Sequence, residues 1–322
     1  MTFNNDVEAV NAFGEKIAQL KSEIAKIIIG QDEVINALLN GIFSQGHCLL
    51  IGVPGLAKTL MVSTLAKVMD ISYNRIQFTP DLMPSDIIGT EILNKQREFF
   101  FNKGPVFAHI ILADEINRTP PKTQSALLEA MQEREVTVAG NTYPLPKPFF
   151  VLATQNPIEQ EGTYPLPEAQ LDRFMFNIWL DYPSMEEEVN IVKATTVGID
   201  TLVDTVLTAE EIIAFQQLVR KIPVTDNVYE FAVNLAGKTR PHLNGSHPMA
   251  DNYLAWGAGP RASQYLIIGA KCNAAMQGKY SPDIEDVKKV AVAVLRHRIV
   301  LNYKAEAENI NVEDIVEEMM KT

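Results

Sequence analysis

The chain reads Gly52-Val53-Pro54-Gly55-Leu56-Ala57-Lys58-Thr59 directly after an apolar run at 47–51. From Leu60 to residue 69, apolar residues recur at helical spacing. A strand, a glycine-bearing loop that ends in Lys-Thr, and a helix are the context of a phosphate-binding loop. The N–H groups of such a loop converge on phosphate oxygens, and the helix N-terminus favours their negative charge. Lys58 would then reach the β- and γ-phosphates, and the Thr59 hydroxyl would ligate Mg²⁺.

An ordinary strand–turn–helix is the alternative interpretation of this stretch. Ala57 stands where a phosphate loop usually has its second glycine. In the alternative, Gly52 and Gly55 serve only a tight turn, which glycine permits at little steric cost. The rest of the chain has to decide between nucleotide binding and a plain turn.

Length and composition indicate a globular protein of two domains. The chain has 322 residues, of which 47% are hydrophobic and 21% charged. Its 2 cysteines show no metal-ligand spacing, and Cys48 lies in an apolar run, which indicates a reduced core thiol and a reducing compartment. The start of the chain lacks a signal-peptide pattern, and no apolar run approaches the roughly 20 residues of a membrane-spanning helix. We therefore expect a cytoplasmic protein without a membrane span.

The net charge is −12, which disfavours a general nucleic-acid-binding protein because such proteins normally carry a basic surface. A local basic patch would still be compatible with this charge.

Two carboxylates follow directly on a second apolar run. Residues 109–113 predict a buried parallel strand, and Asp114 and Glu115 stand at its carboxyl end. Ligands of open α/β sheets bind at this end of the strands. Phosphoryl transfer needs an Asp near Mg²⁺ and a second carboxylate that polarises the attacking water. An acidic helix N-cap explains Asp114 less well, because residues 116–120 intervene before the next predicted helix.

Three further polar side chains lie at the ends of predicted elements. Asn156 follows the apolar strand 149–154, where its amide could hold a water or a γ-phosphate oxygen, but Asn-Pro is also a plain turn signal. Arg173 precedes the last predicted strand and is either a surface residue or directed at a neighbouring subunit. Arg261 lies in the first turn of a helix, where a cation opposes the helix dipole. This position suggests an anionic partner, with a surface salt bridge as the plainer alternative.

The order of the predicted elements indicates an α/β domain followed by a helical one. Five strands alternate with helices, which predicts a parallel sheet with helices on both faces. Composition changes near Pro183, and no strand is predicted beyond it. We therefore expect an α/β domain at 1–183 and an all-helical domain at 184–322. The predicted strands are 47–51, 74–79, 109–113, 149–154 and 175–180, and the helical segments of the second domain are 186–194, 209–221, 227–238, 261–276 and 284–300.

Five motifs occur in one order along the chain: 52–59, Asp-Glu-Ile-Asn-Arg at 114–118, Ala-Thr-Gln-Asn-Pro at 153–157, Leu-Asp-Arg-Phe at 171–174 and Gly-Pro-Arg-Ala at 259–262. Together they closely resemble the AAA+ ATPases, and within these the MoxR family, from about Ile29 to Arg298. The resemblance implies a P-loop AAA+ sheet of five strands, an all-helical lid domain, and an ATPase that uses ATP and Mg²⁺. MoxR-like proteins show an alanine at position 57. We predict a φ below zero for Ala57, because a positive φ would strain it.

The resemblance also implies a role for each site residue. Thr59 and Asp114 would hold the metal, and Glu115 would activate water. Asn156 matches sensor 1, Arg173 the arginine finger and Arg261 sensor 2, while 98–101 and 135–145 resemble the inserted hairpins of this group. Gly30 and Gln31 match the segment near the adenine. The nucleotide-binding residues implied are Gly30, Gln31, Gly52, Val53, Pro54, Gly55, Leu56, Ala57, Lys58, Thr59 and Leu60.

An arginine finger offered to a neighbour implies a ring, and for this family a homo-hexamer. The resemblance further implies a chaperone-like remodelling or maturation factor for protein clients, and a protein with a von Willebrand factor A domain is one candidate partner. Whether Arg118 and Arg261 act within their own chain or across an interface stays open. The alternatives are a nucleotide-switched binding module, and a metal-chelatase or DNA-motor type of AAA+ subunit, of which the acidic net charge disfavours the DNA motor.

Overall fold

The computed structural model describes residues 5–95, 97–159, 162–196 and 201–321. Its centre is a sheet of five parallel strands in the order β2-β5-β8-β1-β9. The predicted parallel sheet is therefore confirmed. Its strands are β1 (Cys48–Gly52), β2 (Tyr73–Gln77), β5 (Ile110–Asp114), β8 (Phe150–Gln155) and β9 (Phe176–Leu180).

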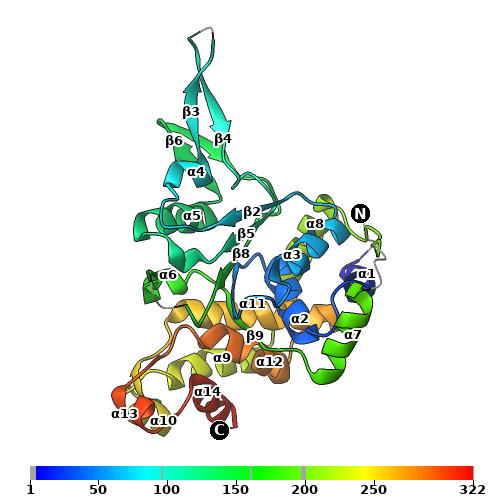
Figure 1. Cartoon of the computed structure of the whole chain (residues 1–322). Helices are drawn as coiled ribbons and strands as arrows, with labels where there is room; N and C mark the ends of the chain where they lie inside the picture. The colour runs from blue at the N-terminus through cyan, green and yellow to red at the C-terminus, as the bar shows by residue number, and fades with distance from the viewer. Residues whose placement is uncertain (1–4, 96, 160–161, 197–200, 322) are drawn as a thin grey trace.

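Side chains of the sheet alternate between two hydrophobic cores. In β5, Ile110 and Leu112 join one core, whereas Ile111 and Ala113 join the other. This follows from the two-residue period of a strand, and it explains why β5 is apolar up to its last residue, Asp114. Helices contribute to both cores, so both faces of the sheet are covered, as predicted (Figure 1). The first core receives α1 (Asp6–Ala25), α2 (Asp32–Phe43) and α3 (Lys58–Val68), and the second receives α5 (Pro121–Glu133).

The second half of the chain is helical, as predicted, with one addition. A short strand β10 (Leu254–Trp256) pairs antiparallel with β11 (Val300–Leu301), so the helix expected as far as residue 300 ends earlier, at Leu295. Helices α8, α9, α11 and α12 share the first core with the sheet. The helices are α7 (Met185–Thr196), α8 (Ala209–Lys221), α9 (Asp226–Lys238), α10 (Pro248–Tyr253), α11 (Pro260–Met276), α12 (Ile284–Leu295), α13 (Tyr303–Ala307) and α14 (Val312–Lys321).

Both predicted hairpins are present, and one of them extends away from the body of the molecule (Figure 1). On the projecting hairpin, Phe99 is 72% exposed, whereas Phe101 stacks on Tyr143 of the second hairpin with ring centroids 4.1 Å apart. The apolar residues therefore form an exposed surface and a packed base at once. The hairpins are β3 (Gly89–Leu93) with β4 (Phe99–Lys103), and β6 (Glu135–Val138) with β7 (Asn141–Pro144); the short helices α4 (Pro84–Ile88), η1 (Ile116–Arg118) and α6 (Glu168–Leu171) complete the fold.

Within the described part of the chain, no helix combines the length and the apolar composition that a bilayer crossing requires.

Candidate active site

The phosphate loop, the two acids and Asn156 meet at the carboxyl ends of neighbouring strands. Strand β1 lies between β8 and β9, and β8 lies beside β5. Because these strands are parallel, the residues that follow each of them lie next to one another. Gln31 joins this edge, since its Nε2 donates to the carbonyl of Asp181, directly after β9, at 3.0 Å.

The phosphate loop enters α3 through a left-handed residue. Ala57 has a φ of +53° and is the N-cap of α3, so the prediction of a φ below zero is wrong. The loop enters α3 directly before Lys58, and at this point the backbone takes a left-handed step although the residue is an alanine. Alternating right- and left-handed residues create the concave array of N–H groups that binds anions. Ala57 thus keeps a conformation that is strained for alanine.

Lys58 contacts the phosphate loop and lies near the two acids. Its Nζ donates to the carbonyl of Gly52 at 2.6 Å. Burial lowers the pKa of Lys58, and the carboxylates of Asp114 and Glu115 oppose that shift. Thr59 is exposed in the first turn of α3. A hydroxyl and a carboxylate are hard oxygen ligands of the kind that Mg²⁺ prefers, so Thr59 and Asp114 fit such a cation.

A buried threonine orients both acids. Thr154 Oγ1 donates to Asp114 Oδ1 at 2.6 Å and accepts from the Glu115 N–H at 2.9 Å. Glu115 itself is left-handed, with a φ of +57°. Such a conformation costs about 1–3 kcal/mol and persists only where the surroundings enforce it. Thr154 is fully buried, so it is well placed to enforce it.

Strand β2 supplies two partners of the acids that sequence reasoning missed. The Arg75 side chain donates to Asp114 Oδ2 from Nε at 3.1 Å and from its NH2 group at 2.6 Å. Gln77 Nε2 donates to Glu115 Oε2 at 2.9 Å. The only sequence signal is that Arg75 and Gln77 flank the buried Ile76 and so share one face of β2. Their proximity to the acids depends on the pairing of β2 with β5, which a single sequence does not reveal.

Arg118 lies against the acids of its own chain. Its NH1 group donates to Glu115 Oε2 at 3.1 Å and lies 3.6 Å from a Glu159 carboxylate oxygen. These ion pairs raise the pKa of Arg118. Arg118 therefore has partners within the chain.

Asn156 is buried just beyond the end of β8, and its Oδ1 accepts from the Ile158 N–H at 3.2 Å. The turn expected from the Asn-Pro pair is thus present as an Asx-type bond. Because the oxygen makes this bond, the amide nitrogen is the donor that a phosphate oxygen would need.

Arg173 and Arg261 lie at the opposite, amino end of the sheet. The Met175 N–H donates to the His47 carbonyl at 2.7 Å, so the segment before β9 lies beside the segment before β1. The 5 residues of β1 separate this level from the phosphate loop. At about 3.3 Å per residue, that is roughly 15 Å. The structure therefore does not bring Arg173 to the phosphate loop of its own chain.

Arg261 is held on the same amino-end segment. Its NH1 group donates to Asp172 Oδ2 at 2.8 Å, and both side chains are partly exposed. Within its own chain, Arg261 therefore makes the surface salt bridge that was the plainer of the two expectations, and Asp172 is its partner. Both predicted arginines therefore lie at the same end of the sheet, away from the other candidate residues.

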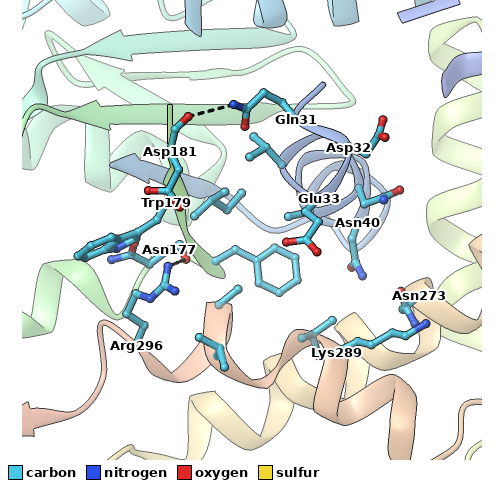
Figure 2. Close-up of a pocket in the computed structure, with 18 of the residues that line it drawn as sticks. Gln31, Asp32, Glu33, Asn40, Asn177, Trp179, Asp181, Asn273, Lys289 and Arg296 are labelled. Carbon is cyan, nitrogen blue, oxygen red and sulfur yellow. Dashed lines mark hydrogen bonds between the residues drawn. The ribbon is translucent and has the colours of Figure 1, made fainter. Parts of the chain in front are cut away.

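A separate cavity of about 910 Å³ lies between α2, β9 and α12 (Figure 2). Figure 2 shows Gln31 bonded to Asp181 at one side of it, and Arg296 beside Trp179. The Arg296 guanidinium carbon lies 5.0 Å from the Trp179 ring centroid. Of the predicted site residues, only Gln31 lines this cavity, and no residue of the phosphate loop at 52–60 does.

Comparisons with known proteins agree with this geometry. Residues 47–176 match the ATPase family associated with various cellular activities (AAA), and residues 247–319 match the AAA lid domain. The chain is 46% identical to the chaperone MoxR1 of Mycobacterium tuberculosis, over 93% of this chain and 80% of that protein. It is 28% identical to the protein MoxR of Methylorubrum extorquens, over 88% of this chain and 87% of that one.

A solved structure from Cytophaga hutchinsonii superimposes with a TM-score of 0.91 at 45% identity, over 98% of this chain and 96% of that one. The fold and the family matches define an ATPase of the AAA+ class. Within that class, the chain belongs to the MoxR family.

Proposed function

We propose that this chain hydrolyses ATP with Mg²⁺ in a homo-hexameric ring, where each active site is completed by the neighbouring subunit, and that it remodels or matures protein clients. The observation that carries this proposal is the separation of the candidate residues. The phosphate loop and the acids lie at the carboxyl end of the sheet, whereas Arg173 precedes β9 at its amino end.

The carboxyl end would bind the nucleotide and hold the water. Residues 52–60 would cradle the phosphates, with Lys58 supplying positive charge, and Gly30 and Gln31 would lie near the adenine. Thr59 and Asp114 would hold Mg²⁺, which neutralises phosphate charge when bound. Glu115 would take the proton of the attacking water, and the Asn156 amide nitrogen would donate to a phosphate oxygen.

The amino end would serve the next subunit. Cations are needed where negative charge accumulates on the transferred phosphoryl group. The Arg173 guanidinium makes no hydrogen bond or ion pair with the residues that the structure describes, so it is available to a partner. A contact between the amino end of one chain and the carboxyl end of the next is head-to-tail, and such contacts form a ring if the rotation closes.

The exposed hairpin supports action on proteins. Ile92, Leu93, Phe99 and Phe100 are all exposed on β3 and β4, and the relative MoxR1 is named a chaperone. A protein with a von Willebrand factor A domain remains a candidate partner.

We further propose a boundary between the α/β domain and the lid at 183/184. A cytoplasmic location is supported by Cys48 and Cys272, which are both buried free thiols.

The Glu115→Gln variant tests the proposed chemistry. It should bind ATP as the wild type does and lose turnover by at least about 100-fold, because the amide cannot accept the proton. Nucleotide binding is measured by titration calorimetry and turnover by phosphate release. Glu129→Gln, on the exposed face of α5, is the matched control and should be fully active. Undiminished hydrolysis by Glu115→Gln would refute the assigned role of Glu115.

A further inference from the structure

A buried arginine of the lid, Arg298, holds the chain on both sides of Arg173. Its side chain is 2% exposed, and in the sequence the residue lies between the end of α12 and β11. Nε donates to Asp172 Oδ1 at 2.8 Å, and the NH2 group donates to the Asp172 carbonyl at 2.9 Å. The same NH2 group donates to the Phe174 carbonyl at 2.6 Å, and NH1 to the Met175 carbonyl at 3.3 Å. One guanidinium thus fixes the backbone before and after Arg173.

The carbonyl of Arg173 itself is contacted by a second lid residue. The Tyr265 hydroxyl donates to it at 3.5 Å, and the Arg298 guanidinium lies 5.0 Å from the Tyr265 ring centroid. Tyr265 lies on α11, four residues after Arg261, so both face the same segment. The carbonyls of residues 172–175 are therefore all held by the lid.

Asp172 joins the two lid arginines. Its Oδ1 accepts from Arg298 and its Oδ2 accepts from Arg261, each at 2.8 Å. Only the planar fork of a guanidinium can reach a carboxylate and several carbonyls at once, and a lysine ammonium cannot reproduce that pattern. Burial lowers the pKa of Arg298, and the Asp172 carboxylate opposes that shift.

We infer that Arg298 is a positioning residue for catalysis in the neighbouring subunit, which sets the direction in which Arg173 and Arg261 leave the surface. This inference rests on the proposed function, in which these two arginines serve the next active site. Arg298 acts through the backbone of 172–175 and the carboxylate of Asp172, and it does not touch the phosphates itself. Arg298 follows the end of α12 by three residues, so a shift at that end of α12 would move the backbone of 172–175 and the Asp172 carboxylate that holds Arg261.

Arg298→Lys tests the inference, because it keeps the buried charge and removes the fork. The kcat should fall by at least about tenfold while the KM for ATP stays within about twofold, since ATP binds at the other end of the sheet. Arg296→Lys is the matched control. Arg296 lies at the same end of α12 and its NH1 group contacts the Asn177 carbonyl at 3.5 Å, away from residues 172–175. Equal losses in both variants would contradict a specific role for Arg298.

Mixed oligomers separate positioning from simple damage to the fold. Glu115→Gln subunits keep intact arginines, and Arg298→Lys subunits keep an intact nucleotide site. In an equal mixture, about one interface in four pairs the nucleotide site of an Arg298→Lys subunit with the arginines of a Glu115→Gln subunit. ATPase activity should therefore return. Arg173→Ala, mixed in the same way, is the reference.

The outcomes are distinguishable. If ATPase activity returns when Glu115→Gln is mixed with Arg173→Ala but not when it is mixed with Arg298→Lys, the inference is overturned and the proposed function stands. Failure of both mixtures would overturn action across the interface, and the inference with it. An Arg298→Lys chain that does not assemble like the wild type in size-exclusion chromatography would assign Arg298 to the fold and also overturn the inference.

Discussion

The two ends of the central sheet carry opposite kinds of chemistry. At the carboxyl end, two carboxylates are held by donors from β2 and β8, the strands on either side of β5: Asp114 by Arg75 and Thr154, and Glu115 by Gln77. At the amino end, Arg261 and Arg298 share the single carboxylate of Asp172. The acids at the carboxyl end are thus paired within the chain, whereas at the amino end three arginines share the neighbourhood of one carboxylate.

This difference shows which requirements of phosphoryl transfer each end of the sheet could supply. A phosphoryl-transfer site needs acids, a cation and positive charge at the transferred group, all within contact distance. Here the two sets lie roughly 15 Å apart along β1, judged from the rise of a strand. A rigid sheet cannot shorten that distance, and for this reason the function proposed above has each site completed by a second copy.

The largest expected effect comes from disabling each end in turn. Lys58→Ala should abolish ATP binding, because the phosphate loop loses its cation. Arg173→Ala should bind ATP normally and lose at least about 100-fold in kcat. Binding and hydrolysis are measured on both variants. Lys67→Ala, in the exposed last turn of α3, is the control for Lys58. An Arg173→Ala chain that loses ATP binding would break the division between the ends.

The amino end should also be the acid-sensitive end. His47, just before β1, donates from Nε2 to the Met131 carbonyl at 3.1 Å and accepts from the Val151 N–H at 3.0 Å. Burial lowers its pKa from 6.5 to about 4. The unfolded chain therefore takes up a proton that the folded chain refuses. The stabilisation is complete above the unfolded pKa of about 6.5 and is lost as the pH falls towards 4.

Urea unfolding at different pH values measures the contribution of His47 to the free energy of unfolding. Between about pH 7 and about pH 5, the free energy of unfolding should fall by about 2 kcal/mol on account of His47 alone. His47→Gln should remove that part of the decline, leaving the part due to His297, whose pKa burial also lowers. His242→Gln is the control, since that side chain is 77% exposed. An unchanged pH dependence in His47→Gln would show that His47 is not the group responsible.

The smallest expected effect lies in the phosphate loop. Ala57→Gly should raise the free energy of unfolding by about 1 kcal/mol, because glycine adopts a positive φ without strain. Ala194→Gly, on the exposed face of α7, should lower it by about 1 kcal/mol, since a helix interior disfavours glycine. Chemical denaturation of the two variants shows whether the free energy of unfolding changes in opposite directions. A loss of stability in Ala57→Gly would mean that the left-handed alanine is not strained.

Sequence predicted the carboxyl end better than the amino end, for a physical reason. The phosphate loop, the acids and Asn156 each follow an apolar strand, and parallel strands place such residues at one edge. The partners Arg75 and Gln77 depend on strand order, which periodicity does not contain. Arg298 lies 126 residues from Asp172, and nothing local in the sequence links them.

The prediction of a negative φ for Ala57 was wrong for a different reason. The prediction considered only the preference of the alanine side chain, but the direction of the backbone at the entry to α3 decides φ there. Residue preference gives way when a loop must make a particular turn.

Mixing Glu115→Gln with Arg173→Ala tests the division between the two ends most directly. Each variant alone should be inactive, one for want of a base and the other for want of the neighbour's cation. With action across a head-to-tail interface, the hydrolysis rate should peak at equal proportions, near about a quarter of the wild-type rate. A rate that stays at the sum of the two residual activities at every ratio would contradict completion of the site by the neighbouring subunit.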